Sequence, residues 1–259
     1  MRKGYRFFMN ASYEEVQNLA TVGVSIKEGI NSYILYENDL DFNKKFTELA
    51  KISASPDNCV EYSKEEFNSS KFFNIELSQQ QGYPKPESKY KEIFYDAKYR
   101  TEEESYLLVQ TNDISAGQIS KSIKGLFGIN WLFVEVFADK STYEKFIKPL
   151  GIKSRRVLNG TRKQEMENIV QLLPQGVSPE NLKSDFEYET IGKNKRIVSD
   201  YHIPLQGYSD KIAFHFFETK EFFGFKDNTY RLPIISKTFY EILQKNKIKG
   251  CRYFPVLRG

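Results

Sequence analysis

The chain has few of the residues on which metal centres, disulfides and redox sites depend. Its 259 residues include two cysteines, Cys59 and Cys251, and two histidines, His202 and His215. Two cysteines cannot form a disulfide framework or a four-cysteine zinc site within one chain, and neither histidine belongs to an HExxH pattern. The sequence therefore predicts no metal site and no cofactor.

Long apolar runs are also absent. No stretch approaches about 18 consecutive apolar residues, and the first residues, MRKGYRFFMNASYEEV, contain no apolar segment of the length that a secretory leader needs. We therefore expect a cytoplasmic protein that has reduced thiols and makes no membrane contact.

Charge of one sign does not accumulate strongly, because the net charge is +4 and lysine alternates finely with glutamate. Nucleic-acid binding usually requires a concentrated basic face, so it is not favoured. Two small basic clusters are explained either as charged strand edges or as contacts to an acidic partner or a phosphate backbone. They comprise Lys153, Arg155, Arg156, Arg162 and Lys163, and then Lys193, Lys195 and Arg196.

Aromatic residues, in contrast, are abundant, with 21 Phe and 17 Tyr, and the hydrophobic fraction is 40%. A chain of this length and composition can bury a substantial core as one large domain or two small ones. Local patterns predict several elements. They are strands at 5–9, 32–38, 105–111 and 130–138, helices at 12–20 and 42–52, two strands around the turn at 192–195, and an irregular segment at 53–92.

One strand–helix–strand unit occurs twice. SKTFYEILQKNKIKGCRYFPV at 236–256 resembles KSTYEKFIKPLGIKSRRVL at 140–158, and an apolar strand precedes each. Capping-box spacing predicts helix starts at Ser141 and Thr238, and Gly151 and Asn246 are suited to the left-handed position at a helix end. The copies differ by a slip of one residue between helix and strand.

These patterns predict an α+β protein with mixed sheets, short helices and two loosely similar halves. The halves are expected at 1–160 and 161–259, and one continuous domain is the alternative. An old duplication and the chance recurrence of a common motif both explain the repeat.

No pattern predicts a catalytic centre. A Cys–His hydrolase would require Cys59 or Cys251 to meet a histidine in space. Cys251 lies in an expected buried strand, so an enzyme with a scattered site would use Cys59 or His215 first. His215 also fits a structural role among the aromatic residues of FHFFET.

The last quarter of the chain resembles a known family. FHFFETKEFFG is followed by YRLPIISKTFYEILQKNKIKGCRYFPV, and IVQLLPQGVSPENL precedes both. This order resembles the double-CxxCG family of bacterial immunity proteins and its cysteine-free relatives. The resemblance covers about 90 residues. Where the family has its second CxxCG, this chain has ETIGKNKRIV, so no zinc role is carried over.

The resemblance implies a non-catalytic immunity protein that neutralises a polymorphic toxin by binding it. Aromatic and arginine side chains commonly anchor such interfaces, and this chain offers five candidates. They are Tyr83, Arg155, Arg156, Phe222 and Phe223. Tyr83 fits a packed loop equally well, and the two phenylalanines fit an inward-facing segment. A scattered-site enzyme and a nucleic-acid-binding protein are the competing functions.

Overall fold

The first strand alternates buried and exposed side chains. β1 (Arg2–Ala11) buries Phe7 and Met9, while Phe8 between them is 48% exposed. A strand with one covered face requires this alternation.

The computed structural model describes residues 1–53, 56–100, 106–132, 134–160, 163–184, 186, 188–191, 195–198, 204–209, 211–224 and 229–258.

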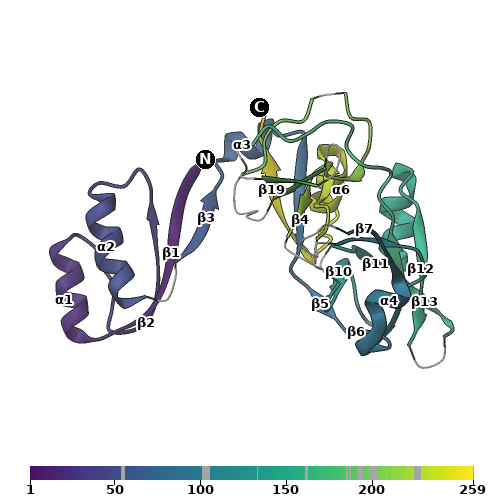
Figure 1. The fold of residues 1–259 in the computed structure, drawn as a ribbon, viewed down its shortest axis with the longest axis horizontal. Helices are drawn as coiled ribbons and strands as arrows, with labels where there is room; N and C mark the ends of the chain where they lie inside the picture. Colours follow the sequence, from purple (N-terminus) through teal and green to yellow (C-terminus); the bar gives the residue numbers. More distant parts are fainter. Residues whose placement is uncertain are drawn as a thin grey trace. The chain divides into compact units, whose positions relative to one another are not determined.

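β1 is the middle strand of a small antiparallel sheet. It pairs with β2 (Gly29–Tyr36) on one side and β3 (Asp57–Glu61) on the other. α1 (Tyr13–Thr21) and α2 (Phe42–Ile52) lie on the same face of this sheet (Figure 1). α1 begins with a capping box, in which the Ser12 hydroxyl accepts from the Glu15 amide and the Glu15 carboxylate accepts from the Ser12 amide.

The chain divides into two compact units, Met1–Asn68 and Ser69–Gly259. α3 (Lys64–Ser69) spans the division. The boundary that we expected near residue 160 falls inside the second unit. The reason lies in segment 53–92, which was expected to be irregular but contains β3, α3 and a strand of the second unit's core.

A seven-stranded sheet forms one half of the second unit. Its order is β5-β10-β11-β13-β12-β9-β6. The antiparallel pairs are β10–β11, β11–β13, β13–β12 and β9–β6, whereas β5–β10 and β12–β9 are parallel. The bounds are β5 (Gln80–Gln81), β6 (Tyr83–Pro84), β9 (Ser115–Gly117), β10 (Leu126–Ile129), β11 (Phe137–Asp139), β12 (Ser154–Asn159) and β13 (Glu165–Leu172).

A four-stranded sheet forms the other half, in the order β16-β18-β4-β19. All three of its pairings are antiparallel. β4 (Phe72–Leu77) lies between β18 (Pro233–Ser236) and β19 (Cys251–Val256), and β16 (Phe216–Glu218) completes the sheet.

The two sheets share a common four-strand plan. In each, a short strand pairs with the first strand of the repeated unit, and an antiparallel strand separates that first strand from the second. The first copy is β10-β11-β13-β12 and the second is β16-β18-β4-β19. Helical residues 140–150 connect β11 to β12 in the first copy, and α6 (Lys237–Lys245) connects β18 to β19 in the second.

The repeated helices begin earlier than their sequences predicted. Asp139 and Ser236, the last residues of their strands, accept hydrogen bonds from the amides of Thr142 and Phe239. The expected capping boxes at Ser141 and Thr238 are therefore wrong, because each strand runs directly into its helix.

The helix ends explain the one-residue slip between the copies. Gly151 takes the expected left-handed conformation, with φ +72°, but Asn246 does not, and Lys247 takes that role with φ +52°. The first helix combines α5 (Lys140–Thr142), η2 (Tyr143–Ile147) and η3 (Lys148–Leu150), and η2 is a π-helical turn. A π turn accommodates one extra residue, so the first copy is one residue longer between cap and turn.

The expected strand at 130–138 is wrong over most of its length. β10 ends at Ile129, and the amide of Leu132 donates to the Ile129 carbonyl at 3.0 Å, closing a turn around Trp131. β11 resumes only at Phe137. Apolar character alone predicted a continuous strand and gave no sign of this turn.

Two smaller sheets complete the second unit. β14 (Tyr188–Ile191) and β15 (Lys195–Val198) form the expected antiparallel pair, and β17 (Phe222–Phe223) joins them in parallel. β7 (Tyr95–Arg100) and β8 (Tyr106–Gln110) form a separate pair, preceded by η1 (Glu87–Lys89) and α4 (Tyr90–Phe94). The fold is thus α+β with several mixed sheets, as predicted.

Candidate functional site

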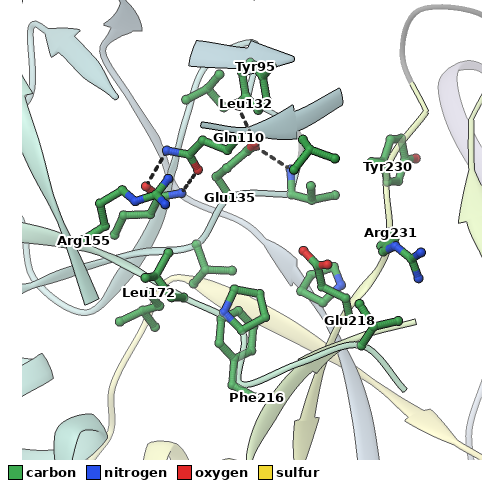
Figure 2. Close-up of a pocket in the computed structure, with 18 of the residues that line it drawn as sticks. Tyr95, Gln110, Leu132, Glu135, Arg155, Leu172, Phe216, Glu218, Tyr230 and Arg231 are labelled. Atoms are coloured by element: carbon green, nitrogen blue, oxygen red, sulfur yellow. Dashed lines mark hydrogen bonds between the residues drawn. The ribbon is translucent and has the colours of Figure 1, made fainter. Parts of the chain in front are cut away.

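A pocket of about 350 Å³ lies in the second unit, and residues from both copies line it (Figure 2). The first copy contributes the segment between β10 and β11 and the end of β13. The second copy contributes β16 and the residues leading into β18. Two glutamates, two arginines and several aromatic residues contribute to its lining, together with apolar side chains.

The first acid of the pocket is Glu135, which lies just before β11. Its carboxylate accepts a hydrogen bond from the Tyr95 hydroxyl and a long one, 3.4 Å, from the Val134 amide. Burial raises the pKa of Glu135, and the hydrogen bond from Tyr95 partly offsets that effect. Burial and the neighbouring carboxylate likewise raise the pKa of the Tyr95 hydroxyl, so it keeps its proton and donates the hydrogen bond to Glu135.

The second acid is Glu218, the last residue of β16. Its side chain makes no hydrogen bond or ion pair with any residue that the structure describes. Burial raises the pKa of Glu218 to about 7, the charge of Arg231 opposes the rise, and the charge of Glu135 adds to it. Figure 2 shows the Glu218 carboxylate pointing toward the centre of the pocket, whereas the Glu135 carboxylate is turned toward Tyr95.

Two glutamines and an arginine form another wall of the pocket. Gln110 and Gln171 exchange two hydrogen bonds, of 3.0 and 2.5 Å, so both amides are fixed in orientation. Arg155 on β12 lies beside them (Figure 2), with its Nε 4.0 Å from Asp113 Oδ1. This wall therefore presents amide groups and one partly compensated positive charge.

Aromatic residues flank the pocket on the side of the turn after β10. Trp131 is 44% exposed and has φ +70°, a conformation that bulky residues rarely adopt. The Tyr83 ring meets it edge-on at 5.0 Å, the Tyr90 ring lies at 6.2 Å, and the Tyr90 hydroxyl donates to the Trp131 carbonyl at 3.3 Å. We call Tyr83, Tyr90 and Trp131 the aromatic rim.

The structure brings two of the five predicted contact residues to this site. Tyr83 is part of the aromatic rim, and Arg155 lines the pocket. Arg156 lies beside Arg155 in sequence, is exposed, and donates to Asp113 at 2.5 Å.

The two predicted phenylalanine anchors are wrong. Phe222 is 3% exposed and Phe223 is fully buried. Both lie in β17, where Phe223 joins the core around β16 and β18 and Phe222 carries the Arg231 guanidinium 4.1 Å above its ring. The alternative interpretation, an inward-facing segment, is confirmed.

The residues considered for a scattered catalytic site have structural surroundings. Burial raises the pKa of the Cys59 thiol on β3, and it raises that of Cys251 on β19 to about 11, which disfavours the reactive thiolate in both. His215 Nδ1 lies 2.8 Å from the Ser236 hydroxyl that caps α6. His202 and Arg162 lie outside the described residues.

Sequence reasoning missed Glu135, Glu218 and Trp131. Glu135 was the single charge within an apolar run, and that isolation was the available signal. Trp131 is the chain's only tryptophan, but it was assigned to a buried strand. Glu218 had no distinguishing pattern, because its proximity to Glu135 arises only when the two copies come together.

Within the described residues, no three His, Cys, Asp or Glu side chains gather in a way that could hold a metal ion. None of the described helices combines the length and apolar character needed to cross a membrane.

Comparison with known proteins adds no functional assignment. No protein-family model and no curated protein matches this chain.

Proposed function

We propose that this chain is a cytoplasmic immunity protein that neutralises a bacterial polymorphic toxin by binding it directly, without catalysis. The proposal begins with the resemblance of the last quarter of the chain to the double-CxxCG immunity proteins and their cysteine-free relatives. It assigns toxin contact to the aromatic rim and places Arg155 at its edge.

The observation that supports this most is the conformation of Trp131. A half-exposed tryptophan in the left-handed region is energetically unfavourable by about 1–3 kcal/mol and persists only where its surroundings hold it. Here the turn to Ile129 and the Tyr90 hydroxyl hold it. Tryptophan, tyrosine and arginine are also the residues that most often dominate binding energy at protein interfaces.

The test is toxin binding and rescue. The natural candidate partner is the product of the reading frame next to this one, purified as an inactive variant for calorimetry and expressed in active form for rescue. Trp131→Ala should weaken binding by roughly 30-fold or more, because central aromatic anchors contribute about 2 kcal/mol or more to binding. Tyr83→Ala should weaken it less.

The matched control is Tyr13→Ala. Tyr13 is an aromatic residue of the first unit that is 69% exposed, so its loss removes a comparable ring without touching the rim. Wild-type affinity in Trp131→Ala, together with unchanged protection of co-expressing cells, would show that the rim is not the contact surface. Failure of the wild-type protein to bind or protect would overturn the immunity function itself.

A further inference from the structure

We propose that the pocket between the two copies is a binding site for a guanidinium group, with the Glu218 carboxylate as its principal acceptor. This site is defined by its own geometry and does not depend on the proposed toxin.

The first reason is that, among the described residues, none makes a hydrogen bond or ion pair with the Glu218 carboxylate, although the charge of Arg231 acts on it. A partly buried carboxylate is costly unless a cation or a hydrogen-bond donor compensates it. Arg231, whose charge acts on Glu218, donates to the carbonyls of Thr219 and Lys220 at 2.6 and 2.9 Å and lies over the Phe222 ring. In Figure 2 its guanidinium points away from the pocket.

The second reason is the presence of Glu135 in the same pocket. Its charge acts on Glu218, and both acids face a shared volume. Two neighbouring carboxylates attract a cation more strongly than one does. The described residues hold no group of three His, Cys, Asp or Glu side chains that could share a metal ion. The aromatic rings that line the pocket beside the two acids suit an organic cation.

The third reason is the shape and lining of the pocket. A guanidinium is planar, donates two parallel hydrogen bonds to a carboxylate and stacks on aromatic rings. Trp131, Tyr90 and Tyr230 line the pocket and supply such rings, and about 350 Å³ suits a small ligand or one long side chain. An ammonium group would satisfy the charge but would use the planar lining less well.

The charged and titratable groups around Glu218 set the pH dependence. Arg231 opposes the rise of its pKa to about 7 and Glu135 increases it. The other such groups lining the pocket are Lys91, Arg155, Tyr90, Tyr95 and Tyr230. A guanidinium requires ionised Glu218, so affinity should rise about tenfold from pH 6 to pH 8.

Trp131 provides a direct readout, because it is the only tryptophan and lines the pocket. Agmatine and L-arginine, titrated into the full-length protein at pH 8, should change its fluorescence with saturation. L-citrulline, which replaces the guanidinium by a neutral urea group, should bind at least tenfold more weakly. Free N-acetyl-tryptophanamide corrects for collisional quenching.

Glu218→Gln should reduce agmatine affinity at least tenfold and abolish its rise with pH. The matched control is Glu167→Gln, since Glu167 is an exposed acid on β13 that does not line the pocket. Calorimetry provides a second measurement of binding, and circular dichroism verifies that each variant is folded. Equal binding of citrulline, or full affinity in folded Glu218→Gln, would overturn the proposal.

Two peptides distinguish whether the pocket takes the guanidinium of an arginine side chain or that of a free small molecule. Acetyl-Gly-Arg-Gly-amide and its citrulline counterpart present the same groups within a polypeptide. Binding of agmatine and of the arginine peptide assigns the pocket to an inserted arginine side chain, whereas binding of agmatine alone assigns it to a free small molecule. If no guanidinium compound binds, the inference fails while the toxin-binding proposal keeps its separate test.

Discussion

The two four-strand copies of the second unit share a plan but differ where they meet. Pairing registers align Phe127 with Phe217, and the helix caps Asp139 and Ser236 also correspond. In the same alignment, Gly128 of the first copy occupies the position equivalent to Glu218 of the second. Neither acid of the pocket therefore has an acidic counterpart, because Glu135 aligns with Leu232, which is 6% exposed.

This difference separates scaffold from site. The residues that build the sheets correspond between the copies. So do the hydrogen bonds that join each helix cap to the residue just before β10 or β16. Asp139 accepts from the Gly125 amide at 2.7 Å, and Ser236 lies 2.8 Å from His215 Nδ1. The pocket uses the positions at which the copies have diverged, which is where a function specific to this chain would arise.

The test with the largest expected effect on stability concerns two glycines that follow the repeated helices. A Cβ at Gly250, where φ is +110°, would lie 1.6 Å from the Leu126 carbonyl oxygen, whereas a Cβ at Gly151 would meet nothing nearer than 3.7 Å. Gly250→Ala should lower the free energy of unfolding by roughly 4 kcal/mol or more, because strain and backbone displacement add.

Gly151→Ala is the control, with an expected loss of about 1 kcal/mol from its left-handed backbone alone. Urea unfolding followed by circular dichroism measures both. Equal losses would mean that the second copy's turn does not depend on close contact with β10.

The next test concerns the acid that only the second copy has. The pKa of Glu218 is about 7 in the folded protein and near 4.5 when unfolded, so the folded state binds more protons between these values. Stability should therefore fall as pH rises from about 5 to 7. Glu218→Gln should remove this slope and raise the free energy of unfolding at pH 8 by roughly 2–3 kcal/mol.

Urea unfolding at pH 5 and pH 8 gives the slope for each protein. Glu167→Gln should leave it unchanged. If Glu218→Gln kept the wild-type slope, burial at this position would be smaller than the structure indicates.

The test with the smallest expected effect gives the second copy the helix-end residue of the first. Lys247 takes the left-handed conformation that Gly151 takes in the first copy. Lys247→Gly should stabilise the protein by about 0.5–1 kcal/mol, because glycine adopts this conformation without a steric cost. Thermal unfolding should show a small increase in Tm, and a decrease would indicate that the Lys247 side chain has a role of its own.

Local sequence patterns predicted the parts of the fold that local physics decides. α1, α2, β1, β2, β8, β12 and β19 were expected close to their observed places, and the repeated unit is present as a three-dimensional arrangement. Their capping residues and apolar spacing suffice to specify them.

The remaining features depend on contacts between distant segments. β4 was missed within the segment expected to be irregular, and its central place comes from pairing with the distant strands β18 and β19. Trp131 was expected in a strand, because apolar composition does not reveal a turn that a hydrogen bond from the distant Tyr90 helps to hold. Of the candidate site, Tyr83 and Arg155 were predicted, but the pairing of Glu135 with Glu218 requires both copies to be folded.

The position of β4 sets the order in which the second unit is completed during synthesis. β4 leaves the ribosome early, yet its two neighbours, β18 and β19, are among the last strands made. Until then both edges of a strand containing Phe72, Phe73 and Ile75 lack their native partners, and such edges promote aggregation. The nascent chain therefore carries β4 without its native partners until β18 and β19 have both been made, and this delay follows directly from the strand order.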